Sequence, residues 1–347
     1  MTRFAIARPQ AFLPPYLLER IAGSASPRLR DRARRTLHED AHFRARAAAL
    51  TLPAGSAERG RSARYVHDAR HLRTLPGELV RSEGDADSGD PAVDEAYHGL
   101  GDTYRLFWEV FQRHSLDDRG MPLMATVHYG QDYENAFWDG RQMVFGDGDG
   151  ELFNRFTIAV DIVAHELAHG VIEHEAALVY AYQAGALNES LADVFGSLAK
   201  QYRDRQSAEE ADWLIGAGLF TDRVAGHALR SMAEPGTAYD DPLLGRDPQP
   251  GHMNDFVETQ DDHGGVHINS GIPNRAYHHA AVSLGGYAWE SVGPVWYDTL
   301  IDPRLASDCE FIAFAELTID NASRRFGSSS REVAAVHEAW RGVGVLP

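Results

Sequence analysis

The 347-residue chain is poor in cysteine, in lysine and in long apolar runs. Its one cysteine, Cys309, excludes an intramolecular disulfide, and the apolar helical pattern around it indicates a small buried side chain. No run of about 18 apolar residues occurs, so we expect no membrane-spanning helix and no membrane partner. Arginines and prolines interrupt the first 25 residues and leave no apolar core for a classical signal peptide. We therefore expect either secretion by a non-classical route or a cytoplasmic location.

Acidic side chains outnumber basic ones, 51 to 33, which gives a formal net charge of −18. The charge is uneven, because residues 1–50 hold ten arginines and four acidic residues, whereas the remainder holds 23 basic and 47 acidic residues. A basic arm on an acidic body can be a nucleic-acid-binding tail or a segment that docks on its own protein. The acidity of the body repels phosphate and favours docking on itself. We therefore expect no nucleic-acid partner.

A His-Glu-x-x-His motif at residues 165–169 lies inside an apolar helical run. Helical residues four apart are separated by about 40° around the axis, so His165 and His169 present two imidazoles on one face, as a zinc site requires. Glu166 lies about 100° round from His165, where it reaches a water on the metal rather than the metal itself. The motif therefore predicts two zinc ligands and a catalytic base.

A second helical pattern carries Asn188, Glu189 and Asp193, with Glu189 twenty residues beyond His169. Glu189 and Asp193 share one helix face. One carboxylate can supply a third zinc ligand, and another can accept the free N–H of a ligating histidine and so fix its tautomer. We expect Glu189 to be the ligand and Asp193 the orienting carboxylate. Three protein ligands leave one position for water, which is the catalytic rather than the structural arrangement of zinc.

With these motifs the chain resembles the thermolysin-like (gluzincin) zinc endopeptidases, from about Tyr65 to the C-terminus. Further segments that carry the resemblance, in one order along the chain, are residues 135–138, 143–150, 180, 230–232 and 264–272. The Pro-Pro-Tyr-Leu-Leu sequence at residues 14–18 is similar to the brief propeptide of the protealysin-like branch of that family.

The resemblance implies an α+β fold of two lobes, with a β-rich N-terminal lobe, a mainly α-helical C-terminal lobe, the active-site helix between them and a short helical propeptide in front. We divide the chain into a basic propeptide (1–50), a linker with the processing site (51–64), an N-terminal catalytic lobe (65–180) and a helical C-terminal lobe (181–347). The local patterns favour helices at 15–21, 28–50, 92–114, 308–326 and 331–342, and strands at 65–68 and 125–129. We expect the chain to stay helical after the second zinc helix, with a short segment starting at 212–216 and a Pro/Gly-rich loop at 239–253.

The resemblance also implies roles for residues outside the zinc motif. It assigns Tyr180 and His267 to the oxyanion of the tetrahedral intermediate, with Asp262 holding His267 in its tautomer. It places the substrate backbone on Asn135 and Ala136 by strand addition at a sheet edge, and a substrate carbonyl on the fork of Arg230. The substrate-binding set also contains Trp138 and a pocket for the residue after the scissile bond, lined by Phe153, Phe156, Ile162 and Leu229. Taken alone, each of these apolar residues is at least as well explained by core packing.

Larger relatives carry a calcium cluster beside the zinc helices, and this chain keeps Asp161 and Asp212 of its positions but has Lys200 at another. Lys200 is the only lysine, beside 32 arginines. An ammonium group donates three hydrogen bonds, so it can replace a cation that needs 6 to 8 oxygen ligands. We expect Lys200 to pair with Asp161, and calcium to be absent or reduced. The Asp-Gly-Asp-Gly run at 147–150 is expected to be a structural turn.

Together these observations predict a neutral endopeptidase with one catalytic Zn²⁺ that cleaves on the amino side of bulky hydrophobic residues and is made as a zymogen. Its expected partners are protein or peptide substrates and its own propeptide. Residues 1–50 contain no cysteine to cap the metal, so the block must be steric and electrostatic, with residues 14–17 near the active site. The alternative is a catalytically inactive zincin-fold protein that binds peptides or metal. The presence of all three ligands and the base favours the enzyme.

Overall fold

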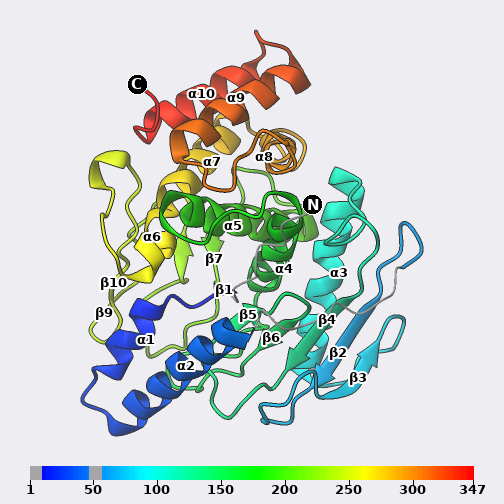
Figure 1. The fold of residues 1–347 in the computed structure, drawn as a ribbon, viewed down its shortest axis with the longest axis vertical. Helices are drawn as coiled ribbons and strands as arrows, with labels where there is room; N and C mark the ends of the chain where they lie inside the picture. The colour runs from blue at the N-terminus through cyan, green and yellow to red at the C-terminus, as the bar shows by residue number, and fades with distance from the viewer. Residues whose placement is uncertain (1–9, 47–56) are drawn as a thin grey trace.

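The computed structural model describes residues 10–46 and 57–347. A six-stranded sheet occupies the lower part of the molecule in Figure 1, helices α4 and α5 cross its middle, and the C-terminal helices stack above them. The expected α+β fold with a β-rich N-terminal part, a helical C-terminal part and N-terminal helices is thereby confirmed. No helix in the described part of the chain has the length and apolar character that crossing a membrane requires.

The sheet has the strand order β1-β5-β6-β4-β2-β3. Strands β2, β4 and β6 run parallel, whereas β1, β3 and β5 pair antiparallel with their neighbours. The bounds of its members are β1 Gln10–Ala11, β2 Arg64–Asp68, β3 Glu78–Ser82, β4 Leu123–Val127, β5 Ala136–Trp138 and β6 Met143–Phe145. Helix α3 (Pro91–Phe111), which starts at the side-chain cap of Asp90, packs on β2 and β4. β1 belongs to the N-terminal segment. In the sheet that the rest of the chain forms, β5 is therefore the edge strand.

Two long buried helices form the centre of the molecule, α4 (Val160–Glu175) and α5 (Tyr182–Asp204). Their close packing depends on a glycine, because a Cβ at Gly196 would lie 2.7 Å from the backbone oxygen of Asp161 and 3.5 Å from the backbone nitrogen of His165. Any larger residue would push the helices apart. The zinc motif on α4 and the carboxylates on α5 are therefore held at a fixed, short separation.

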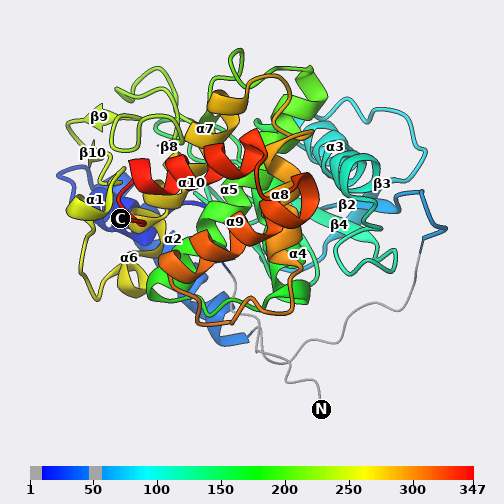
Figure 2. The ribbon, with the colours of Figure 1, turned by 90° about the horizontal axis from the view of Figure 1, so that it is seen from above.

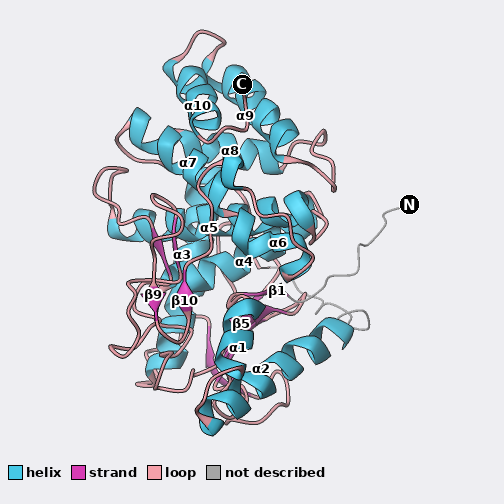
Figure 3. Ribbon diagram, turned by 90° about the vertical axis from the view of Figure 1, so that its left-hand side faces the viewer, coloured by secondary structure: helices cyan, strands magenta, loops and turns pink. Residues whose placement is uncertain are grey.

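The C-terminal part consists of helices packed over α5 (Figures 2 and 3). They are α6 (Asp262–Asn269), α7 (Gly271–Leu284), α8 (Val292–Leu300), α9 (Phe311–Phe326) and α10 (Arg331–Gly342). Trp296 of α8 and Trp340 of α10 stack in parallel with ring centroids 5.9 Å apart, which joins the outer helices to the core. Cys309 is a free, buried thiol, as its apolar setting predicts.

The expectation that the chain stays helical after α5 is wrong. Arg205 ends α5 in the left-handed conformation, and the following segment forms two short hairpins, β7 (Leu214–Ile215) with β8 (Arg230–Ser231) and β9 (Asp240–Asp241) with β10 (Gly245–Arg246), and one 3₁₀ turn, η2 (Met253–Asp255). The carbonyl of Leu214 accepts from Lys200 and the N–H of Gly216 donates to Asp161. Because buried charges use these backbone groups, they are not available for helical hydrogen bonds.

The N-terminal segment lies beside strands β5 and β6 of the sheet (Figure 1). After β1 it forms α1 (Pro15–Ala22) and α2 (Pro27–Arg46), close to the expected helices. Leu17, Leu18 and Ile21 are fully buried, so α1 packs with one apolar face on the body. Residues 51–56 of the expected linker lie outside the described residues, whereas residues 57–64 are described and the expected catalytic lobe begins in β2.

Candidate zinc site and active site

Helices α4 and α5 bring His165, His169 and Glu189 together in the interior. The two imidazole Nε2 atoms are 3.1 Å apart, and carboxylate oxygens of Glu189 lie 3.4 Å from His165 Nε2 and 3.6 Å from His169 Nε2. Tetrahedral zinc with bonds of 2.0–2.2 Å places its ligand atoms about 3.3 Å apart. All three side chains are buried, with at most 2% of their surface exposed. This spacing fits a zinc ion.

The outer partners of the histidines show why a cation belongs between them. His165 Nδ1 is 2.8 Å from Asp193 Oδ1, and His169 Nδ1 is 2.9 Å from Asn188 Oδ1. Each Nδ1 therefore donates its proton to an oxygen, which leaves the lone pairs of both Nε2 atoms pointing at one spot. Two lone pairs and a carboxylate repel one another unless a positive ion lies between them. The donor set therefore fits a metal ion.

Asp193 is held in its ionised form by two basic partners, Arg230 and His165, and by the neutral donor Asn274. Arg230 donates to it through Nε and Nη2, both at 2.8 Å, and Asn274 donates at 2.9 Å. Burial opposes ionisation, but the charge of Arg230 and the hydrogen bond from His165 outweigh it and lower the pKa of Asp193 to about 2. A carboxylate fixed in this way orients His165.

Glu166 is fully buried on α4 next to the first ligand. In the apoprotein, burial raises the pKa of Glu166 to about 8, although the charge of His165 lowers it. A carboxylate that binds protons near neutral pH is suited to take a proton from water and give it up again.

Tyr180, His267 and Asp262 form a hydrogen-bonded chain beside the ligands. The hydroxyl of Tyr180 donates to Glu189 and lies 3.2 Å from His267 Nε2. Asp262 accepts the backbone N–H of His267 at 2.8 Å and faces its Nδ1 at 2.6 Å. Burial disfavours the charged imidazole, but Asp262 and Glu189 outweigh it and raise the pKa of His267. Nε2 of His267 therefore carries a proton that it can donate.

The segment before α1 lies directly over this site. β1 pairs antiparallel with the edge strand β5, with Gln10 opposite Trp138 and Ala11 opposite Phe137. Phe12 N–H donates to the carbonyl of Ala136 at 2.9 Å. Residues 11–13 thus make these backbone contacts to the site, and residues 14–17, which we expect near the active site, follow directly at the start of α1. The N-terminal segment therefore adds a strand to the edge that was expected to receive substrate.

Asn135 and Arg230 hold the next groups of the same segment. The N–H of Leu13 donates to Asn135 Oδ1 at 2.8 Å, and Asn135 Nδ2 donates to the Leu13 carbonyl at 3.3 Å. Arg230 Nη1 donates to the carbonyl of Phe12 at 3.4 Å. The carbonyl of Ala11 lies 3.2 Å from His267 Nε2. The backbone groups from the Ala11 carbonyl to the Leu13 carbonyl thus meet residues that the sequence predicted for substrate binding or for the oxyanion.

The ring of Phe12 is completely buried beside the zinc ligands. Its centroid is 5.1 Å from that of His165 in an edge-on arrangement, and the guanidinium of Arg230 lies 4.8 Å from the ring. A Cβ at Gly216 would lie 3.4 Å from this ring and 3.5 Å from Leu229, so Phe12 and Leu229 are neighbours there. The remaining expected pocket residues are buried in the same hydrophobic core as Phe12: Phe153, Phe156 and Ile162.

Trp138 was expected at this site, whereas the roles of Asn188 and Asn274 were not predicted from the sequence. Trp138 takes part through its backbone in β5, and its indole N–H donates to Glu173 at 3.1 Å. Sequence analysis noted Asn188 without giving it a role, although it follows the same logic as Asp193. Asn274 and Phe12 were not found at all. No periodic signal marks Asn274, because it reaches Asp193 from the separate helix α7.

Lys200 of α5 is buried between α4 and the segment that follows α5. Its ammonium is 2.9 Å from Asp161 and 2.8 Å from Asp212, and it donates to the Leu214 carbonyl at 2.6 Å. Burial disfavours the ammonium ion, but Asp161 and Asp212 outweigh this and raise the pKa of Lys200. Three oxygen atoms therefore lie within 2.9 Å of the ammonium.

Comparisons with known proteins agree with this geometry. Residues 46–173 match the model of the thermolysin metallopeptidase catalytic domain, and residues 176–345 match that of the thermolysin metallopeptidase alpha-helical domain. The chain belongs to the thermolysin metallopeptidase family. Residues 10–38 match the protealysin propeptide. The chain is therefore a thermolysin-like metalloprotease with a propeptide, made as a zymogen, as the resemblance implied.

Individual relatives extend the match over nearly the whole chain. An extracellular metalloprotease of Pectobacterium carotovorum subsp. carotovorum is 54% identical over 338 residues, which cover 96% of this chain and 95% of the relative. Protease PrtS of Photorhabdus sp. (strain Az29) is 54% identical over 263 residues, 75% of this chain and 70% of the relative. The solved precursor of protealysin, a metalloproteinase from Serratia proteamaculans, is 54% identical with a TM-score of 0.89, covering 97% of this chain and 100% of that one.

These relatives also decide two earlier alternatives. The relatives are named as proteases, which supports the enzyme over a catalytically inactive binding protein. The expected localisation is wrong, because relatives are named extracellular metalloproteases and so point to secretion. The composition of the first 25 residues was a poor guide, because an apolar core is only one property that an exported protein can show.

Proposed function

We propose that this metalloprotease cleaves peptide bonds on the amino side of bulky hydrophobic residues and that its propeptide blocks the cleft by binding as a substrate does. The single observation that supports this most strongly is the position of Phe12. Its buried ring lies beside His165 and Leu229, while its N–H and carbonyl meet Ala136 and Arg230. The bond between Ala11 and Phe12 thus lies where a scissile bond would be expected.

The roles follow from this placement. A zinc ion held by His165, His169 and Glu189 would lower the pKa of a bound water towards ~7. Glu166 takes the proton of the attacking water and passes it to the departing amine.

The charge that develops on the substrate carbonyl meets two donors that lie beside the zinc ligands. Tyr180 and His267 donate to the oxyanion, at the position where Ala11 now offers its carbonyl to His267. Asp262 accepts the Nδ1 proton of His267 and stabilises the charged imidazolium, whose Nε2 proton is then directed at the carbonyl. Asn135 and Arg230 keep the substrate backbone in register with β5.

We also propose the domain limits given above, with residues 1–50 as the propeptide and the processing site within 51–64. Arg32 of α2 supports the docking of the propeptide, because its guanidinium lies 3.2 Å from Asp132, 3.5 Å from Asp149 and 3.8 Å from Glu151. The basic arm thus pairs with acidic groups of the body.

We further propose that Lys200 takes the place of calcium and that zinc is the only metal required for catalysis. The three contacts of its ammonium with Asp161, Asp212 and the Leu214 carbonyl support this, since a calcium ion there would need the same oxygens. In the loop after β6, Asp149 accepts three successive backbone N–H groups, of Glu151, Leu152 and Phe153, which supports a structural turn at 147–150.

Blocked peptides that differ only in the residue after the scissile bond test the specificity. We expect turnover with Leu or Phe at that position, little turnover with Asp or Gly, and none after zinc chelation or with Glu166→Ala. Equal turnover of the Leu and Asp peptides would refute the proposed pocket. Absence of turnover by the processed, zinc-loaded wild type would refute the proposed reaction.

A further inference from the structure

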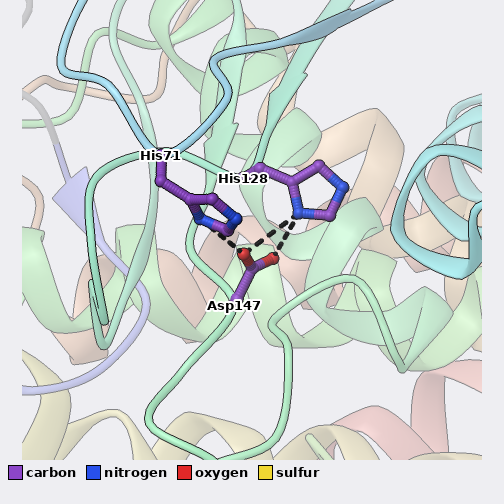
Figure 4. Close-up of side chains that lie close together, drawn as sticks. All are labelled: His71, His128 and Asp147. Carbon is purple, nitrogen blue, oxygen red and sulfur yellow. Dashed lines mark hydrogen bonds and ion pairs between the residues drawn. The ribbon is translucent and has the colours of Figure 1, made fainter.

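A second group of metal-ligand side chains lies on the surface of the N-terminal lobe, formed by His71, His128 and Asp147. Figure 4 shows the carboxylate of Asp147 pointing between the two imidazole rings. His71 Nδ1 lies 3.3 Å from Asp147 Oδ2, and His128 Nδ1 lies 2.9 Å from Oδ1. One ligand atom from each of the three residues lies within 4.8 Å of the others. These separations resemble those among the ligands of the catalytic site.

The topology of the sheet holds these three residues together. β2, β4 and β6 are adjacent parallel strands, and the carboxyl ends of such strands meet at one edge. Asp147, His128 and His71 follow the ends of β6, β4 and β2 by two, one and three residues. The N–H of His71 donates to the carbonyl of His128 at 2.8 Å, so the two histidines are linked through their backbones. The sheet therefore fixes the relative positions of the three residues.

The outer partner of His128 matches that of a metal-bound histidine. Its Nε2 lies 3.0 Å from Asp90 Oδ2, as the Nδ1 of His165 lies 2.8 Å from Asp193. A histidine that donates one N–H to a carboxylate presents a lone pair on its other nitrogen. Here Nδ1 of His128 faces Asp147 beside Nδ1 of His71, so a metal ion that displaces its proton would meet a lone pair there. Two imidazole nitrogens and a carboxylate that converge in this way need either added protons or a metal ion between them.

We propose that His71, His128 and Asp147 bind a second zinc ion, separate from the catalytic one. Two imidazoles and one carboxylate form a donor set suited to zinc, and about 3.3 Å between ligand atoms is the spacing that tetrahedral zinc requires. His71 is 61% exposed on its side chain, so it can rotate to complete the geometry and leave the fourth position to water. This inference does not rest on the proposed specificity or latency.

The ion would join two loops that also hold the propeptide. Arg73, in the loop of His71, forms an ion pair with Glu39 of α2, and Asp149, in the loop of Asp147, pairs with Arg32 of α2. A zinc ion between the loops would keep both ion-pair partners in place. Zinc bound here would therefore stabilise the lobe on which the propeptide docks.

Zinc counting on the intact proprotein tests the site. We expect about two zinc ions per chain for the wild type after dialysis against micromolar free zinc, measured by elemental analysis, and about one for His71→Ala and for Asp147→Asn. His98→Ala is the matched control, because His98 is similarly exposed and also contacts one aspartate, Asp87. This control should keep two ions.

A thermal scan gives an independent readout. Raising zinc from one equivalent to the micromolar free level should increase the Tm of the wild type and of His98→Ala, and should leave that of His71→Ala unchanged. One zinc ion in the wild type would overturn the proposal and would mean that protons alone join these residues. Two zinc ions in both His71→Ala and Asp147→Asn would also overturn it, because the second ion would then lie elsewhere.

Discussion

Lys200 and Asp161 form a buried ion pair that joins the two zinc helices, with Nζ 2.9 Å from Oδ2. Asp161 has no exposed surface, and its other oxygen accepts the N–H of Gly216 at 3.0 Å. Removal of one partner of such a pair leaves an uncompensated charge in the interior. Asp161 thus connects α4, which carries the two zinc-binding histidines, with Gly216, which adjoins Phe12.

We expect Lys200→Ala to lower the free energy of unfolding by about 3–5 kcal/mol, because Asp161 would stay buried without a cation. Arg203→Ala is the control, since Arg203 lies on the same helix but is 40% exposed and pairs with the neighbouring Asp204. Its loss should cost well under ~1 kcal/mol. Urea unfolding of the three proteins measures the difference.

The same ion pair leads to a prediction about calcium. A calcium-selective chelator should leave the Tm of the wild type unchanged, because the ammonium of Lys200 already satisfies the oxygens of Asp161, Asp212 and the Leu214 carbonyl. A scan with added calcium is the complementary measurement. A large calcium-dependent rise in the wild-type Tm would contradict the replacement of the ion by lysine.

The zinc helices were predictable because their logic is local. A spacing of four places His165 and His169 on one face, and the same rule places Glu189 near Asp193 on the next helix. The pairing of β7 with β8 was not predictable from a local pattern. It depends on the hydrogen bonds of Leu214 with Lys200 and of Gly216 with Asp161. Phe12 was missed for a related reason. Its role depends on a contact with Ala136, which lies far along the chain, and the two-residue strand β1 before it leaves no periodic pattern.

Zinc content separates the roles of the two glutamates at the catalytic site. Glu166→Ala should retain about one zinc ion at this site while activity is lost, because Glu166 does not ligate the metal. Glu189→Ala should lose both metal and activity, since only two histidines would remain. Elemental analysis and peptide turnover on the same samples measure this. Equal metal loss in both variants would mean that the roles are assigned wrongly.

Phe12 gives a direct test of latency. Truncation of a buried Phe to Ala costs about 3–5 kcal/mol. If most of that loss weakens docking of the propeptide, Phe12→Ala should raise the peptidase activity of the intact proprotein by a factor of roughly 100 or more. Mass spectrometry must show that the chain is still uncleaved. Glu19→Ala, an exposed change on α1, is the control and should stay latent. Unchanged latency of Phe12→Ala would rule out Phe12 as the main block.

Glu134 lies under helix α2, where its N–H meets the hydroxyl of Thr36 at 3.3 Å. It has no exposed surface. Burial and the neighbouring Asp149 raise the pKa of Glu134 from 4.5 to about 8, although Arg32 of the propeptide lowers it. The native proprotein thus holds a proton here that the unfolded chain releases at a much lower pH.

The free energy of unfolding should therefore fall as the pH rises from about 4.5 to about 8, because in this window the native state binds the proton more tightly than the unfolded state. Glu134→Gln removes the titration, so the variant should match the wild type near the lower limit and be more stable at the upper limit. Urea unfolding of both proteins across this window measures the gap. The exposed Glu58→Gln is the control and should give a constant gap. A gap for Glu134→Gln that does not change with pH would contradict the raised pKa.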